Sequence, residues 1–222
     1  MIKNMSMCVL LLGSLNAYAA DFSVASVEDD GAFCPFFDSD ICVSFYMDGP
    51  IEKGDAEWLE NRINKMKGSV DGLSARIGVI DIDSPGGDVY EAMRLGRIMR
   101  ENRIQAIVSQ QSVCYSACVL VLAGAVGRFT VGEVGVHSFY NPGVGEGGFD
   151  YQDEERRFRE VSESIGSYLD EMRVSRRLLD EMMNTPASTI NVLGWEKVKD
   201  YSLFGIDPLF HQYLRFSGYL EN

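Results

Sequence analysis

The sequence predicts an α/β fold in which helices flank a mainly parallel sheet. Two short, almost continuously apolar runs, at residues 76–82 and 104–109, are typical of strands buried on both faces of a parallel sheet. Segments with apolar residues at helical spacing separate these runs and follow them along the chain. Strands that alternate with helices in this way are joined by right-handed crossovers. The carboxyl ends of the strands then share one edge, where the ligand sites of such folds gather.

The individual elements follow from local patterns. Strands are expected at residues 41–47, 76–82, 104–109, 128–131 and 134–139. Helices are expected after Asp55 and Asp88, over 116–123, 150–173 and 175–183, and in the tail after Trp195. Asp55 and Asp88 are expected to be helix N-caps, and Glu91 stands where a reciprocal capping box requires it. Residues 21–40 are expected to be irregular, and residues 110–114 to form a turn.

Length and charge limit the classes of protein that fit. A chain of 222 residues, 46% of them hydrophobic, is long enough for one domain with a sizeable core. No internal repeat or change in composition divides it, so we expect a single domain over residues 20–222. The formal net charge of -13 repels nucleic acid and anionic lipid headgroups, and we therefore expect no nucleic-acid partner.

The N-terminus has the pattern of a secretory signal peptide. Lys3 supplies a basic start, residues 5–15 form an apolar run, and Ala17-Tyr-Ala19 matches the small-x-small cleavage site. The apolar run is too short to span a bilayer comfortably, which argues against a retained anchor. We expect residues 1–19 to be a cleaved leader, with the mature protein in the periplasm or secreted and without a stable membrane anchor.

The cysteines suit an oxidising compartment. Of five, Cys8 leaves with the leader, so an even number remains. The simplest pairing of these is Cys34 with Cys42 and Cys114 with Cys118. A metal site is the competing explanation, but His137 and His211 are the only histidines and no tight ligand cluster exists. We expect neither a metal nor a cofactor.

Three short pieces could together build a nucleophilic hydrolase site. They are Asp83-Ser-Pro-Gly-Gly-Asp88, Cys114-Tyr-Ser-Ala-Cys118 and Gly135-Val-His-Ser138. Ser116, at the start of an apolar helix, would be the nucleophile, and His137, at the end of a strand, would take its proton. The backbone N–H groups of Gly86, Gly87 and Ala117 would hold the oxyanion.

Each piece also has an ordinary structural explanation. The glycines could form a tight strand-to-helix turn, Ser116 could be a helix N-cap, and His137 could be structural. Taken singly, these explanations are at least as good as the catalytic one. The combination of the three pieces, in this order, favours the hydrolase site.

The same three pieces carry a resemblance to a known family. Gly-Gly after a strand, a serine flanked by small residues, and then Gly-Val-His resemble the Clp protease proteolytic subunit and its relatives in the Clp/crotonase superfamily. The resemblance spans roughly residues 43–207, is clearest over 80–137, and includes Arg128, four residues after Gly124. It implies repeated β-β-α units with a mainly parallel sheet, a serine–histidine site and assembly into homo-oligomers. The Cys-x-Ser-Ala-Cys variant with a signal peptide resembles an exported, periplasmic branch.

The sequence departs from the family at the third member of the catalytic triad. Family members carry an aspartate shortly before the segment that corresponds to 194–207 here, but residues 185–191 contain no acid. Ser188, Thr189 or Asn191 could orient the imidazole, or the site could work as a dyad. Without a buried carboxylate the imidazolium is less stabilised, and turnover is slower.

The predicted function is that of an exported, ATP-independent serine peptidase acting on peptides or unfolded protein. Two alternatives belong to other classes. The missing acid would also fit a catalytically inactive protein that binds or scaffolds. The shared fold and glycine loop would fit a crotonase-like acyl-CoA enzyme, although export away from the CoA pool argues against it.

Overall fold

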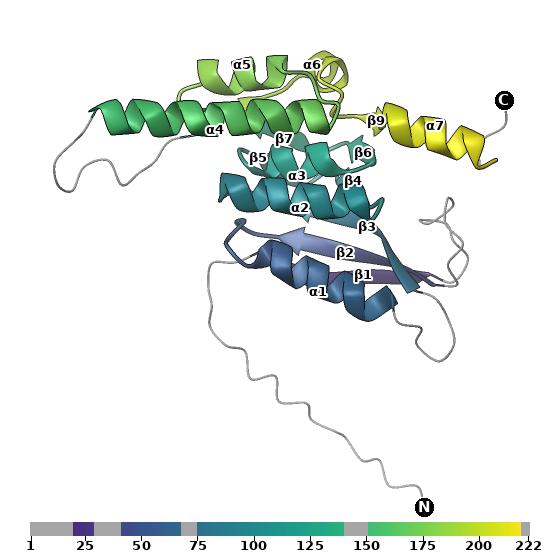
Figure 1. The fold of residues 1–222 in the computed structure, drawn as a ribbon. Helices are drawn as coiled ribbons and strands as arrows, with labels where there is room; N and C mark the ends of the chain where they lie inside the picture. The colour runs from purple at the N-terminus through teal and green to yellow at the C-terminus, as the bar shows by residue number, and fades with distance from the viewer. Residues whose placement is uncertain (1–19, 29–40, 68–74, 140–150, 219–222) are drawn as a thin grey trace, which may run out of the picture.

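A computed structural model describes residues 20–28, 41–67, 75–139 and 151–218 (Figure 1). The predicted leader and Cys34 lie outside the described residues. No helix within these ranges is long and apolar enough to cross a bilayer.

The larger sheet has six strands in the order β1-β2-β3-β4-β6-β9. Its strands are β1 (Asp21–Glu28), β2 (Ile41–Asp48), β3 (Ala75–Asp83), β4 (Gln105–Val108), β6 (Gly127–Thr130) and β9 (Gly205–Ile206). The pairings from β2 through β6 are parallel, and the edge strands β1 and β9 pair antiparallel. The carboxyl ends of the central strands therefore lie at one edge.

A smaller sheet begins where β3 ends. It has the order β5-β7-β8, with β5 (Val113–Tyr115) parallel to β7 (Glu133–Val136) and β8 (Asn191–Val192) antiparallel to it. Ser84 joins the two sheets: its N–H donates to the Val113 carbonyl at 2.8 Å, and its carbonyl accepts from the Tyr115 N–H at 3.0 Å. All three predicted catalytic pieces lie around this junction.

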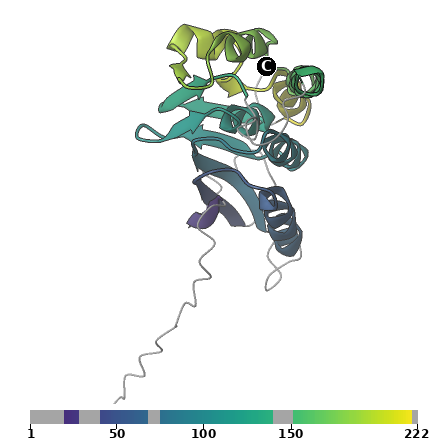
Figure 2. The same cartoon turned by 90° about the vertical axis from the view of Figure 1, so that its left-hand side faces the viewer.

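Three helices form a layer against the larger sheet. These are α1 (Asp55–Lys67), α2 (Val89–Glu101) and α3 (Cys118–Gly124), and Figure 2 shows α1 and α2 along the same face. Helices α2 and α3 approach closely because glycines meet at their crossing: a Cβ on Gly124 would lie 2.2 Å from the Gly96 Cα. Every residue of α3 is buried, which explains its run of small and apolar residues.

The remaining helices lie beyond the smaller sheet or continue to the C-terminus (Figure 1). They are α4 (Tyr151–Glu171), α5 (Arg177–Asn184), α6 (Trp195–Asp200) and α7 (Pro208–Phe216). In α4 the C-terminal half is anchored, since Ile165 and Leu169 are buried and the buried Tyr168 hydroxyl donates to the Leu120 carbonyl at 2.7 Å. Phe158, in the N-terminal half, is 39% exposed.

Arg128 is an internal cation that links several elements. It is 1% exposed and donates to the carbonyls of Ala123, Met172 and Ser202. Burial lowers the pKa of its guanidinium to about 10, against the attraction of Asp207. The arginine thereby ties α3, the end of α4 and the turn after α6 into one unit.

Four local predictions need correction. Residues 21–28 are not irregular but form β1, because they pair antiparallel with β2, and the predicted turn at 110–114 ends in β5. Asp55 is not an N-cap but lies inside α1. Asp88 does cap α2, accepting from the Glu91 N–H at 2.7 Å, but Glu91 does not complete a capping box. Its carboxylate instead accepts from Gly54 and Ala56, at 3.0 and 2.9 Å, and so caps α1.

Candidate active site

Ser116 occupies a sharp turn between β5 and α3. Its φ is +56°, a left-handed conformation that is uncommon for a residue with a Cβ and costs on the order of 1–3 kcal/mol. Its N–H donates to the Gly135 carbonyl at 2.9 Å, and its carbonyl accepts from the Val119 N–H at 3.1 Å. The serine is half-buried, and its hydroxyl has no hydrogen-bond partner among the described residues. Hydrogen bonds therefore fix the backbone N–H and carbonyl of Ser116, while its hydroxyl makes none within the described ranges.

A disulfide bond brackets this turn. Cys114 and Cys118 are joined, as predicted, with their Cα atoms 5.2 Å apart, and both residues are fully buried. Cys42 is also disulfide-bonded, and its predicted partner Cys34 lies outside the described residues.

The glycine loop packs directly against the turn that holds the serine. A Cβ on Gly86 would lie 2.6 Å from the Ser116 Cβ and 3.0 Å from the Ala117 nitrogen. A Cβ on Gly87 would lie 2.1 Å from the Ile51 carbonyl oxygen. Both glycines also have positive φ, of +101° and +150°. Only glycine fits at either position, and the loop is brought beside Ser116.

The available backbone donors are Gly87 and Ala117. Gly86 is buried, and its N–H donates to the Ser84 hydroxyl at 3.2 Å. Gly87 is exposed, and its N–H has no partner among the residues described. The Ala117 N–H precedes the first turn of α3 and is likewise free of hydrogen bonds within the described ranges. Of the two predicted glycine donors, Gly87 is the one whose N–H has no partner among the described residues.

His137 follows β7 at the same edge of the small sheet. Tyr115 and Gly135 are paired in the parallel ladder, so Ser116 and His137 leave neighbouring strands in the same direction. The His137 Nδ1 lies 2.9 Å from the Ser138 carbonyl oxygen. Because a carbonyl can only accept, Nδ1 carries a hydrogen, so in the neutral imidazole Nε2 has the lone pair that a general base requires. No hydrogen bond joins Ser116 to His137 in the described structure.

The segment predicted to supply a third member runs alongside the histidine strand. Ser138 donates its N–H to the Thr185 carbonyl at 2.8 Å, and Asn191 pairs with Val136. None of Ser188, Thr189 and Asn191 hydrogen-bonds His137 in the part of the chain that is described. The group that contacts the imidazole is the Ser138 carbonyl. A backbone carbonyl leaves no signal in the sequence, which is why sequence analysis missed it.

Two of the predicted candidates, Thr189 and Asn191, have other partners. The Thr189 hydroxyl donates to the Pro186 carbonyl at 3.1 Å, and the Asn191 amide donates to Glu181 at 2.6 Å. Glu181 also binds Lys197 and the Tyr201 hydroxyl, at 2.6 and 2.9 Å. The hydrogen bond from Lys197 is the main cause that lowers the pKa of Glu181. This cluster fastens β8, and with it the edge of β7, to α5 and α6.

Among the described residues, no three or more His, Cys, Asp or Glu side chains come together in a group that could hold a metal ion. A cavity of about 380 Å³ lies at the opposite edge of the larger sheet. It is lined by residues at the starts of β3 and β4, such as Ala75 and Ile104, and at the end of α1, such as Ile63. It is therefore remote from Ser116.

The mixed α/β fold has a likeness among solved structures, whereas the arrangement at the strand ends rests on the contacts described above. Among solved structures, the chain is similar to a ClpP1 mutant from Listeria monocytogenes, with a TM-score of 0.53 and 17% sequence identity over 72% of this chain and 88% of that one. No model of a protein family and no curated protein matches the sequence. The likeness confirms the predicted Clp-like α/β fold. At this identity it shows the fold alone, and the roles assigned to Ser116 and His137 stay predictions.

Proposed function

We propose that the protein is an exported, ATP-independent serine peptidase that uses Ser116 as nucleophile and His137 as general base. The observation that carries the proposal is the close packing of the Gly86–Gly87 loop against Ser116 and Ala117. It brings the loop that carries the free Gly87 N–H against a serine held in a strained turn and followed by the free N–H of Ala117. An ordinary strand-to-helix turn does not need this combination.

The steps follow from these groups. The Ser116 hydroxyl adds to the carbonyl carbon of a peptide bond while its proton passes to the His137 Nε2. The oxyanion binds to the N–H groups of Gly87 and Ala117, and the imidazolium then returns the proton to the leaving amine. Water then loses a proton to the same nitrogen and adds to the acyl carbon, and the imidazolium returns that proton to the Ser116 oxygen as the bond to the acyl group breaks. The Ser138 carbonyl holds the Nδ1 hydrogen throughout.

This arrangement predicts a slow peptidase. A carbonyl fixes the tautomer of His137 but stabilises the imidazolium less than a carboxylate does, because it carries no full charge. Loss of the correctly placed carboxylate in a triad lowers kcat by about 10⁴-fold, which marks the largest penalty to expect. We infer acylation that is easily detected with an activated probe and slow turnover of unactivated peptides.

The compartment, substrates and assembly belong to the same proposal. The predicted leader over residues 1–19 and the Cys114–Cys118 disulfide support the periplasm or the extracellular space. Such compartments lack ATP, which fits a peptidase that accepts short peptides or already unfolded protein. Assembly into a homo-oligomer follows from the family resemblance.

The test is labelling of the purified mature protein with a fluorophosphonate. We expect an adduct at Ser116 in the wild type and none in Ser116→Ala. Ser112→Ala, which alters a half-buried serine just before β5, should label normally. An unlabelled wild type, or equal labelling of Ser116→Ala, would overturn the proposal.

A binding or scaffolding protein without catalysis is the second candidate. One observation favours it: no described hydrogen bond joins Ser116 to His137, and no described carboxylate binds the imidazole. A non-catalytic protein would leave the wild type unlabelled by the fluorophosphonate. It would also bind peptides equally well with and without the Ser116→Ala substitution. Crotonase-like acyl-CoA chemistry is separated from both by calorimetric titration with CoA, which should show no binding.

A further inference from the structure

We propose that the Cys114–Cys118 disulfide is a positioning device that holds Ser116 in its reactive conformation, so that the peptidase becomes active only once this pair is oxidised. The inference rests on the proposed function and adds a regulation to the same site. It assigns to the two cysteines a role beyond global stability.

One end of the bond is fixed in the sheet. Cys114 is the central residue of β5, which is hydrogen-bonded to Ser84 on one side and paired with β7 on the other. Val134 is its ladder partner in β7. This cysteine therefore belongs to the rigid junction that also positions the glycine loop and the strand of His137.

The other end is the first residue of the helix that carries the oxyanion donor. Cys118 opens α3, a fully buried helix, and the Ala117 N–H stands immediately before it. Between the two sulfur-bearing residues lie only Tyr115, Ser116 and Ala117. The bond thus spans the nucleophile and one oxyanion donor and ties the sheet to the helix across them.

The serine needs such a tie because its backbone is strained. A non-glycine residue at a φ of +56° persists only where its surroundings over-determine it. The Ser116 N–H and carbonyl are each held by one hydrogen bond, to Gly135 and Val119. Without the covalent link, the residue can relax to negative φ, which turns both the hydroxyl and the Ala117 N–H away from the glycine loop.

The size of the ring closed by the bond points to a local role. The entropy that a disulfide removes from the unfolded chain grows with the logarithm of the loop it closes, and a separation of four residues is near the lower limit. A bond placed for overall stability would gain more by joining distant segments. This one instead restrains the few residues that carry the proposed chemistry.

The chemical step is an oxidation during folding. The thiols of Cys114 and Cys118 lose two electrons and two protons to a disulfide-bearing oxidant, protein or small molecule, which is reduced to two thiols. Both cysteines are completely buried in the folded protein, so a reductant meets the bond only when the chain opens. A chain that folds under reducing conditions, before export, would lack the bond and remain inactive.

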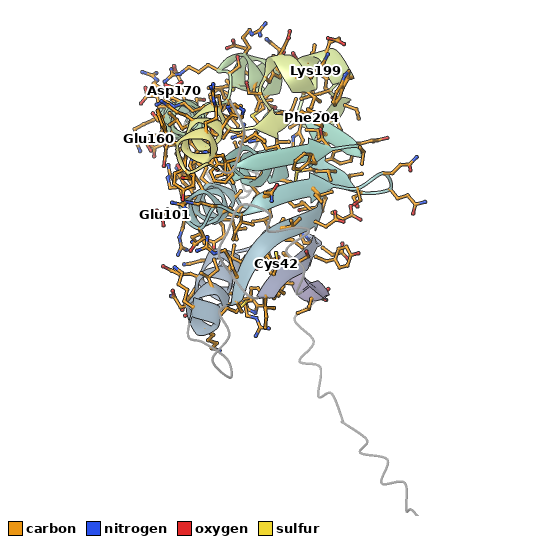
Figure 3. All side chains as sticks on the ribbon, turned by 90° about the vertical axis from the view of Figure 1, so that its right-hand side faces the viewer. Cys42, Glu101, Glu160, Asp170, Lys199 and Phe204 are labelled. Carbon is orange, nitrogen blue, oxygen red and sulfur yellow. A yellow bond between two sulfur atoms is a disulfide. The ribbon has the colours of Figure 1, made fainter. Side chains whose placement is uncertain are left out.

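The test compares loss of the Cys114–Cys118 bond with loss of the predicted Cys34–Cys42 pair in the mature protein. Cys114→Ala/Cys118→Ala removes the bond at the site, and Cys34→Ser/Cys42→Ser is the matched control. Cys42 lies on β2 of the larger sheet. Figure 3 shows it away from α4 and α6, the helices on which the labelled Asp170 and Lys199 lie. We expect the second-order rate of fluorophosphonate labelling to fall by about tenfold or more in the first variant and to change less than about twofold in the control. Circular dichroism should show that both variants are folded.

A second measurement tests the proposal even if the Cys114→Ala/Cys118→Ala variant does not fold. Wild-type protein refolded with a limiting oxidant contains reduced and oxidised chains, which mass spectrometry separates after thiol alkylation. The adduct should be found on chains that hold the Cys114–Cys118 bond. Equal labelling of both populations, or a folded Cys114→Ala/Cys118→Ala variant that labels within about twofold of wild type, would refute the positioning role while leaving the peptidase intact. Oxidised wild type that gains no adduct at Ser116 would overturn the proposed function and this inference with it.

Discussion

Gly86→Ala is the most incisive perturbation of the proposed site. The new methyl group would lie 2.6 Å from both the Ser116 Cβ and the Tyr115 carbonyl oxygen, closer than non-bonded atoms can approach. The backbone at this position has a φ of +101°, which an L-residue rarely adopts. The substitution therefore forces the glycine loop away from the turn that holds the serine.

The magnitude follows from two contributions. Overpacking by one methyl group in a filled region costs about 1–3 kcal/mol, and a side chain at positive φ adds about 1–2 kcal/mol. The sum, about 2–5 kcal/mol, is below the whole stability of a typical domain, about 5–15 kcal/mol, so most of the protein should remain folded. Displacement of the Gly87 N–H removes one oxyanion donor, which lowers the acylation rate by about 10²–10³-fold.

Gly54→Ala is the matched control. Its φ of +114° imposes a similar conformational strain, but a Cβ there has no neighbour within 4 Å. Fluorophosphonate labelling kinetics and urea unfolding should be measured on both variants. We expect Gly54→Ala to lose some stability and keep the labelling rate. If Gly86→Ala labels as fast as Gly54→Ala, the close packing of the glycine loop does not shape the site.

Three further predictions concern the histidine and two polar groups near the small sheet. His137→Ala should slow labelling of Ser116 by about 10²–10⁴-fold at neutral pH without changing the unfolding midpoint, because it removes only the base; an unchanged rate would exclude that role. The Tyr115 hydroxyl donates to Glu133, and this hydrogen bond raises the pKa of Tyr115 to about 12. Its contribution to stability is complete below pH ~10 and disappears as the pH rises toward 12. Burial also raises the pKa of Tyr168 and Tyr201, so the ultraviolet titrations of wild type and Glu133→Gln should differ by one tyrosine, which titrates late in the wild type and earlier in the variant. The pKa of Glu181 is lowered, chiefly by its hydrogen bond with Lys197, so its contribution is present above its ordinary pKa, about 4.3, and is lost on acidification. Urea unfolding between about pH 7 and pH 3 should therefore show a loss of stability that is smaller in Glu181→Gln, and equal losses in both proteins would contradict the assignment.

The weak point of the proposed catalysis is the group that faces the imidazole. The Ser138 carbonyl is set by a backbone hydrogen bond from the Ser138 N–H to Thr185, so its position depends on how β7 and the segment after α5 fit together. Glu181 stabilises that segment through Asn191 and Lys197 without contacting His137. A carboxylate is not needed to select the tautomer, but its absence limits the rate.

Sequence patterns were sufficient where local chemistry decides the outcome. The apolar run at residues 76–82 predicted β3, and Asp88 predicted the start of α2, because a buried strand and an N-cap depend on residues close in the chain. The pair Cys114–Cys118 was predicted for the same reason, since four residues separate its members. The sequence also identified the three segments, 83–88, 114–118 and 135–138, that the structure brings to one edge. It could not give the distances between them.

Only the tertiary structure decided contacts between distant segments. Glu91 caps α1 rather than its own helix, and β1 exists because β2 pairs with it. In each case a backbone group or side chain could form a hydrogen bond with more than one partner. The bond that forms is the one to the group that folding brings within reach. Spacing along the chain determines which groups could take part, whereas the packing of sheets and helices determines which of them meet.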